Sequence, residues 1–108
     1  MNREERITRN EAISRQINEG IEEATSSISD EGFARMVCEC GHSNCERVLA
    51  ISIPEYEKVR RDPRQFVVVN DHVMPEIEQP LYETDRFMVV RKREGIPAVV
   101  AEDTDPRD

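Results

Sequence analysis

The hydrophobic residues near the start of the chain recur at helical spacing. The series is Ile13, Ile17, Ile21, Ala24 and Ile28, with steps of four, four, three and four residues. Such steps place side chains on one face of an α-helix. Thr8 and Glu11 have the spacing of a capping box, so we expect the helix to begin there.

The polar residues of this segment are expected on the opposite side, facing solvent. They are Glu11, Arg15, Glu19 and Glu22. We therefore predict an amphipathic N-terminal helix whose isoleucines pack on the rest of the domain, or on a second copy of the chain to give a homodimer. The stretch SSISDEG at residues 26–32 is rich in linker residues, so residues 1–32 are predicted to form a helix and a linker.

After this linker the hydrophobic pattern changes from helical to extended. Residues 33–38 and 46–52 contain β-forming residues on either side of a cysteine-rich stretch, which indicates a hairpin with the cysteines at its tip. Ser52 and Glu55 form a second capping box with Pro54 in the first turn. A short helix is therefore predicted from about residue 53 to residue 61.

The remaining apolar runs indicate further strands. QFVVV at residues 65–69 predicts a buried strand, and His72 follows it after an Asn-Asp turn. Runs at residues 86–92 and 97–102 flank a Glu-Gly pair and predict a terminal hairpin. Residues 103–108 are expected to be a solvated tail.

Composition indicates a small domain with a thin core. The chain has 108 residues, of which 37% are hydrophobic, against a usual share of roughly 45 to 50%. A domain of this size often needs a metal ion or another crosslink to be stable. We expect an α+β fold, in which residues 33–102 form a small antiparallel sheet with one short packed helix and the amphipathic helix precedes them.

The net charge and the hydrophobic pattern of the chain disfavour some classes of partner. The net charge of -8 repels a phosphate backbone, which disfavours nucleic acid as a partner without excluding it. No apolar run approaches the roughly 18 residues of a membrane span, and the charged start MNREER does not resemble a signal peptide. We therefore expect a cytoplasmic location and an unidentified cytoplasmic protein as partner.

All three cysteines lie within CECGHSNC at residues 38–45. Cys38 and Cys40 are two residues apart, so on an extended backbone both side chains leave the same face. Gly41 permits a turn, and Cys45 returns a third sulfur. Three thiols cannot all pair with one another, and a reducing cytosol disfavours disulfides. Three thiolates and one further ligand form the tetrahedral site that zinc prefers, and such a site would staple the domain.

The fourth ligand must come from one of the two histidines. We predict His72, because a distant ligand would tie two halves of the thin core together. His42 is the alternative, since it lies inside the cysteine loop itself. Free or redox-active thiols, another metal and an iron–sulfur cluster are the alternatives to zinc.

The sequence contains no recognised catalytic motif. It lacks a His-Glu-x-x-His helix, a serine nucleophile elbow and a glycine-rich phosphate loop. If water held the fourth metal position, Glu39, Glu76 or Glu78 would be the candidate bases. Three thiolates, however, weaken zinc as a Lewis acid. We therefore predict a protein that is not an enzyme, with no catalytic residues.

The order of these motifs resembles a group of small uncharacterised actinobacterial proteins. The resemblance covers residues 33–72 and includes the Cys-x-Cys pair, the third cysteine, the segment YEKVR at residues 56–60, the phenylalanine strand and the histidine. It implies metal ligation by Cys38, Cys40, Cys45 and His72 and implies no activity. Where that group more often has a glycine before the histidine, this chain has Asn70-Asp71.

A basic cluster ends the short predicted helix. It consists of Lys58, Arg60, Arg61 and Arg64. Cations at this end of a helix complement its dipole, and arginines also bind phosphates or carboxylates, so these four are candidate partner-binding residues. The function that the sequence favours is a non-enzymatic zinc-binding interaction or regulatory module. A thiol-based redox or zinc sensor and a nucleic-acid-associated factor using this cluster are the alternatives.

Overall fold

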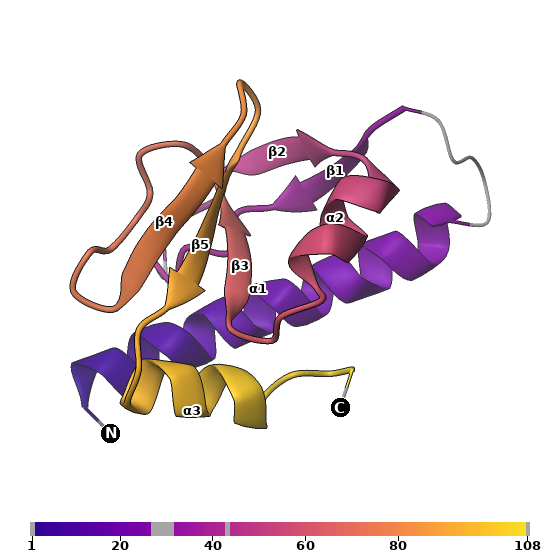
Figure 1. The fold of residues 1–108 in the computed structure, drawn as a ribbon. Coiled ribbons are helices and arrows are strands. Elements are labelled where there is room, and N and C mark those ends of the chain that lie inside the picture. The colour runs from indigo at the N-terminus through magenta and orange to yellow at the C-terminus, as the bar shows by residue number, and fades with distance from the viewer. Residues whose placement is uncertain (1, 27–31, 43, 108) are drawn as a thin grey trace.

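The computed structural model describes residues 2–26, 32–42 and 44–107. It has the α+β fold that the sequence predicts (Figure 1). In chain order the elements are α1 (Arg3–Ser26), β1 (Ala34–Val37), β2 (Val48–Ile51), α2 (Ile53–Val59), β3 (Gln65–Val68), β4 (Glu78–Glu83), β5 (Met88–Lys92) and α3 (Ile96–Asp103). Ile28 and most of the predicted linker lie outside the described residues. Among the helices of the described ranges, none has the length and apolar character that a membrane span requires.

Two antiparallel sheets form the β part of the fold. β1 and β2 pair as a hairpin, with Ala34 opposite Ile51 and Val37 opposite Val48, which confirms the predicted hairpin around the cysteines. The other sheet has the order β3-β5-β4. The sequence pattern did not predict β4, because this edge strand contains Pro80 and its side chains after Glu78 are exposed.

Buried side chains form two main clusters. The first lies where the hairpin, α2 and the sheet meet, and it includes Met36, Ile51, Tyr56, Val59 and Phe87. The second includes Phe66, Val68 and Val90 of the sheet together with Cys38 and Cys40. Two of the cysteines are therefore part of the core.

The face of α1 that packs on the domain is largely the one that was predicted to face solvent. Ile13 and Ile17 are 60% and 50% exposed. The fully buried side chains of the inward face are Thr8, Glu11, Arg15 and Asn18. The prediction that the isoleucines cover the domain is therefore wrong for Ile13 and Ile17, whereas Ile21 is partly buried and packs on the first core cluster. The fully buried stripe through which the helix docks is polar.

The polar stripe of α1 is buried because three of its side chains, Glu11, Arg15 and Asn18, find partners on the domain. Arg15 donates hydrogen bonds to the carbonyl oxygens of Pro63 (2.6 Å) and Ala101 (2.7 Å), and its guanidinium lies 4.4 Å from the centre of the Phe66 ring. Asn18 accepts from the Val37 N–H at 2.8 Å and donates to the Val37 carbonyl at 2.9 Å. An apolar stripe would leave these backbone groups unpaired.

The start of α1 also differs from the prediction. The helix begins at Arg3, and the Asn2 side chain caps it by accepting the Glu5 N–H at 2.8 Å. Thr8 lies inside the helix, where its hydroxyl donates to the Glu4 carbonyl at 2.8 Å. Thr8 and Glu11 therefore do not form a capping box, because both side chains are turned into the domain.

The second predicted capping box is confirmed at the start of α2. The Ser52 hydroxyl accepts the Glu55 N–H at 3.2 Å, and the Glu55 carboxylate accepts the Ser52 N–H at 2.9 Å. This helix places Tyr56 and Val59 in the core.

Residues 97–102 form helix α3, so the predicted terminal hairpin is wrong. β5 lies between β3 and β4, which leaves neither of its edges open to a further strand. Gly95, with a φ of 100°, turns the chain away from the sheet, and Pro97 lies in the first turn of the helix. Ala98 and Ala101 are buried, and α3 lies alongside α1 (Figure 1).

Candidate metal centre

Three separate turns of the chain converge at the candidate metal centre. Cys38 and Cys40 directly follow β1, Cys45 precedes β2, and His72 follows β3. Their ligand atoms, three sulfurs and one ring nitrogen, all lie within 4.8 Å of one another. The structure thus brings together the four residues that the sequence singled out.

The spacing of the donor atoms suits a tetrahedral ion. The Nδ1 atom of His72 lies 3.5 Å from the Cys38 sulfur and 3.7 Å from the Cys45 sulfur. Zinc bonds of about 2.0 to 2.3 Å at tetrahedral angles place neighbouring donors about 3.5 to 3.8 Å apart. The two distances from His72 therefore suit a tetrahedral metal ion such as zinc.

Tight turns of the backbone hold both halves of the centre. The N–H of Val69 donates to the Cys38 sulfur at 3.1 Å, and the N–H of His72 donates to the Val69 carbonyl at 3.0 Å. Asp71 has a φ of 76°, the left-handed conformation that glycine adopts most easily. The N–H bond to sulfur stabilises a thiolate and orients it toward the centre.

Gly41 is where α1 meets the cysteine loop. Its φ is 80°, and a Cβ atom there would lie 2.7 Å from the Ile7 side chain and 2.8 Å from the Glu11 side chain. The amide of Asn10 also donates to the Gly41 carbonyl at 3.3 Å. The loop that carries the cysteines is therefore packed closely on α1.

Beneath this contact lies a buried cluster of charged groups. The ammonium of Lys92 is hydrogen-bonded to the carboxylates of Glu11 and Glu78, and all three side chains are fully buried. Burial raises the pKa of Glu11 well above its usual value. Glu78 also accepts the Met74 N–H at 3.0 Å, so its carboxylate has a structural role rather than the position of a base at the metal.

The thiols of the centre influence one another strongly. A hydrogen bond from the Cys38 thiol lowers the pKa of Cys40 to about 4. The same bond, together with burial, raises the pKa of Cys38. One sulfur of the pair is thus readily available as a thiolate, which is the form that binds metal.

The side chain of Glu39 turns away from the sulfurs. Its carboxylate accepts the Val67 N–H at 2.9 Å and the Asn18 amide at 2.8 Å, and burial raises its pKa to about 7. Glu76 is exposed and pairs with Arg3 at 2.8 Å. The candidate bases suggested by the sequence therefore serve contacts within the fold.

His42 lies on the rim of the centre. It is exposed, and its ring centre lies 6.2 Å from that of His72. Among the described residues, the cluster whose donors converge consists of Cys38, Cys40, Cys45 and His72 and does not include it.

The predicted basic cluster is divided between the interior and the surface. Arg60 has a fully buried side chain that pairs with Glu19 and Asp105. Arg64 pairs with Glu94 at 2.7 Å and Glu102 at 3.4 Å. The Lys58 ammonium lies 4.9 Å from the Tyr82 ring centre, and Arg61 is exposed.

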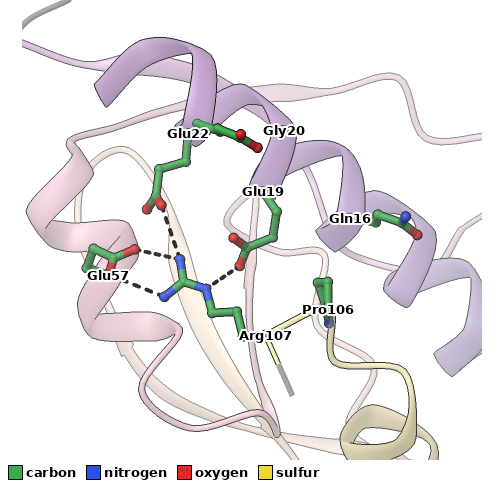
Figure 2. A pocket seen from close by; sticks show the side chains of 8 residues that line it. Gln16, Glu19, Gly20, Glu22, Glu57, Pro106 and Arg107 are labelled. Atoms are coloured by element: carbon green, nitrogen blue, oxygen red, sulfur yellow. Dashed lines mark hydrogen bonds and ion pairs between the residues drawn. The ribbon is translucent and has the colours of Figure 1, made fainter. Parts of the chain in front are cut away.

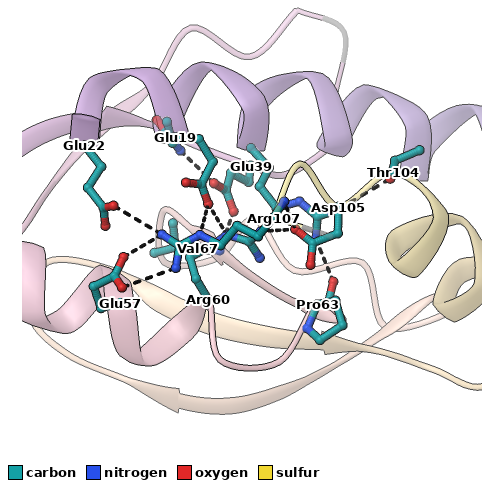
Figure 3. A network of polar contacts seen from close by, with 12 residues as sticks. Glu19, Glu22, Glu39, Glu57, Arg60, Pro63, Val67, Thr104, Asp105 and Arg107 are labelled. Carbon is teal, nitrogen blue, oxygen red and sulfur yellow. Dashed lines mark hydrogen bonds and ion pairs between the residues drawn. The ribbon is translucent and has the colours of Figure 1, made fainter. Parts of the chain in front are cut away.

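Arg60 belongs to a network of ion pairs that the sequence pattern did not reveal (Figure 3). Arg107 extends from the C-terminal segment and pairs with Glu19 (2.7 Å), Glu22 (3.2 Å) and Glu57 (2.5 Å). Residues 103–107 therefore lie against α1 and α2 instead of extending into solvent as expected. The partners come from three distant segments, so no local spacing could have indicated them.

Comparisons with protein-family models, with curated proteins and with solved structures find no match to this chain. The resemblance of residues 33–72 to the actinobacterial group therefore stays a prediction. The assignment of a metal centre depends on the geometry of Cys38, Cys40, Cys45 and His72.

Proposed function

We propose that the chain is a non-enzymatic zinc-binding module in which Cys38, Cys40, Cys45 and His72 hold one zinc ion. The observation that carries this proposal is the convergence of three sulfurs and one imidazole nitrogen within 4.8 Å. Thiolate and imidazole donors select zinc over magnesium or calcium, which prefer oxygen ligands.

We infer a structural role for this ion rather than a catalytic one. Four protein ligands fill a tetrahedral shell and leave no position for a reacting water. Three thiolates also bring the net charge of the centre to about -1, which makes the metal a weak Lewis acid. The ion would join the cysteine loop to the end of β3 and, through Gly41, support the docking of α1.

We assign this zinc-held fold an interaction or regulatory role in the cytoplasm. Among the described residues, the carboxylates near the centre and most of the cationic side chains of the basic cluster contact other parts of the same chain. We therefore expect a partner to bind on the surface of the folded module, and we expect that partner to be a protein.

The metal proposal is tested by elemental analysis of protein purified without added metal. We expect one zinc per chain in the wild type and in His42→Ala. His72→Ala should bind zinc more weakly by at least about 100-fold, because it loses a direct ligand. Equal zinc content in His72→Ala and the wild type, or loss of zinc in His42→Ala alone, would overturn the assignment.

A thiol-based sensor is the second candidate function, and one observation favours it. Cys45 is only half-buried, so a small oxidant can reach a sulfur of the cluster. Hydrogen peroxide would take two electrons from two thiolates, forming one disulfide and two hydroxide ions. Zinc would be released because the disulfide sulfurs no longer bind it.

The sensor is tested by titrating the zinc-loaded protein with peroxide. We expect release of one zinc for each disulfide formed, a lower melting temperature, and recovery of both after reduction with zinc present. Unchanged zinc content and melting temperature at an excess of peroxide would eliminate the sensor and leave the structural zinc proposal intact.

A further inference from the structure

The outward face of α1 carries apolar side chains that the described part of the chain leaves uncovered. Ile13 and Ile17 are 60% and 50% exposed in the middle of this helix. Gly20 continues the same face, and a Cβ atom there would meet nothing within 4 Å. The opposite face of α1 is already buried, and within residues 2–26, 32–42 and 44–107 these two isoleucines remain largely exposed.

Helix α3 extends this apolar surface on one side. Ile96 and Val99 are 44% and 54% exposed. They share a hollow with Arg9 of α1, and Arg9 also lines the hollow next to Ile13. Four of the exposed apolar side chains, Ile13, Ile17, Ile96 and Val99, therefore lie on the neighbouring helices α1 and α3. A group of exposed apolar side chains is typical of an interaction surface.

The two ends of the α1 face carry opposite charge. Arg6 and Arg9 are exposed at the N-terminal end, where Arg9 also pairs with Glu5 of the same helix at 3.1 Å. At the C-terminal end, beside Gly20, lies a hollow in which carboxylates outnumber the single arginine (Figure 2). Its charged residues are Glu19, Glu22, Glu23, Glu57 and Arg107. Arg107 pairs with three of these carboxylates, so the hollow still has more negative than positive groups. This face is therefore basic at one end, apolar in the middle and acidic at the other.

We propose that α1 packs antiparallel against α1 of a second copy of this chain, about a two-fold axis near Arg15. Ile13 of each copy then faces Ile17 of the other. Arg6 and Arg9 approach the acidic end of the neighbouring helix, where Gly20 allows close contact. When two copies of this face pack antiparallel, the basic end of each lies against the acidic end of the other. Such self-complementarity suits an isologous dimer, in which both copies use the same surface.

The helix is long enough for this arrangement. α1 has 24 residues, which corresponds to about 36 Å at 1.5 Å per residue. Both isoleucines and both charged ends can therefore contact a second copy at once. The pairing does not involve the metal ligands, so it stands independently of the proposed zinc site.

The first test is the mass of the zinc-loaded protein in solution, measured by sedimentation equilibrium over a range of concentrations. We expect the wild type to reach the mass of two chains. Ile13→Glu/Ile17→Glu should weaken the dimer by at least about 100-fold, because four buried side chains per dimer are replaced by carboxylates. Val48→Glu is the matched control, since Val48 is 50% exposed on β2, and it should leave the dimer intact.

The second test concerns the antiparallel order. Arg6 and Ala24 lie at equal distances from the axis, so Arg6→Glu and Ala24→Arg should each weaken the dimer. The double variant Arg6→Glu/Ala24→Arg should restore it, because opposite charges then face one another again. Each variant is accompanied by its melting temperature and zinc content, so that unfolding is not taken for dissociation.

Several outcomes would overturn the proposal. A wild type that stays a single chain at every concentration would do so. A dimer that survives Ile13→Glu/Ile17→Glu, or one that Val48→Glu dissociates equally, places the interface elsewhere. A double charge variant that is weaker than either single variant rules out the antiparallel order.

Discussion

Gly41 has the most demanding environment among the described glycines. It combines a φ of 80° with a contact to α1 so close that a Cβ atom would lie 2.9 Å from the Ile7 carbonyl oxygen. It is also the neighbour of Cys40, so its conformation sets the course of the cysteine loop. Gly41 is therefore required both for the left-handed backbone conformation of the loop and for its close packing on α1.

Gly41→Ala is expected to destabilise the fold by about 2 to 4 kcal/mol, from left-handed strain plus overpacking. Zinc binding should weaken as well, because the loop must move away from α1. Gly32→Ala is the matched control, since Gly32 has a φ of 87° and open space around its Cβ position. It should cost only about 1 to 2 kcal/mol. Chemical unfolding and zinc titration of both variants check this, and equal losses would contradict the role of the helix contact.

The residues of the candidate centre could be predicted because their signal is local. The Cys38, Cys40 and Cys45 spacing lies within one loop, and a fourth ligand could come from only two histidines. The roles of Glu39 and Arg60 could not be predicted in this way. Their partners lie on distant elements, and a buried carboxylate or guanidinium looks like any surface charge in the sequence.

Among the helices and strands, those whose signals lie within one segment could be predicted from the sequence. The β1–β2 hairpin and α2 follow from turn and capping residues within each segment. Which face of α1 packs on the domain does not follow from local signals. Arg15 and Asn18 are buried because they bind backbone groups of distant residues, namely Pro63, Ala101 and Val37. Hydrophobic periodicity identifies the helix but cannot show that the domain offers polar partners to its other face.

Asn18→Ala tests the polar docking of α1. The Asn18 amide satisfies both backbone groups of Val37 and one oxygen of Glu39. Its removal should lower the free energy of unfolding by about 2 to 4 kcal/mol, because these buried groups lose their partners. Urea unfolding measures the change, and Glu4→Ala, which replaces an exposed side chain in the first turn of the same helix, should stay within about 0.5 kcal/mol. A small effect of Asn18→Ala would mean that α1 does not depend on its polar stripe.

The contact between α1, α2 and the C-terminal segment predicts a pH dependence. Burial raises the pKa of Glu22 from 4.5 to about 7, and Glu57 beside it strengthens the shift. Since the folded chain holds this proton more tightly than the unfolded chain, Glu22 favours folding at low pH. That contribution is lost as pH rises from about 4.5 to 7. The pKa of Glu57 is lowered to about 2 by its hydrogen bond from Arg107, so Glu57 titrates below this range.

Glu22→Gln removes this titration. Relative to the variant, the wild type should lose stability as pH rises through this range, and the difference should stay constant at higher pH. Urea unfolding of both proteins at a series of pH values checks the prediction, with Glu4→Gln as the control on the same helix. Parallel curves for the wild type and Glu22→Gln would contradict the raised pKa.

For the whole molecule, we expect a metal ion at the centre to keep the cysteine loop and the segments packed on it ordered. The loop contacts β3 through Cys38 and Val69 and contacts α1 through Gly41 and Asn10. Removal of the ion should therefore loosen the loop, the turn before His72 and the N-terminal half of α1 together. The contacts of α2 with the first core cluster do not involve the ligands, so this part should remain ordered longer.

Hydrogen exchange with and without a strong zinc chelator measures this spread directly. We expect chelation to lower the melting temperature and to speed exchange at residues 38–45, at residues 70–72 and in the first half of α1, with a smaller change in α2. His72→Ala should show the same pattern without chelator, and His42→Ala should behave as the wild type. Zinc binding contributes to folding free energy, so excess zinc should raise the melting temperature of the wild type and not that of His72→Ala. If exchange changed equally everywhere, the ion would stabilise the chain as one cooperative unit. If it changed nowhere, these four side chains would come together without any help from a metal.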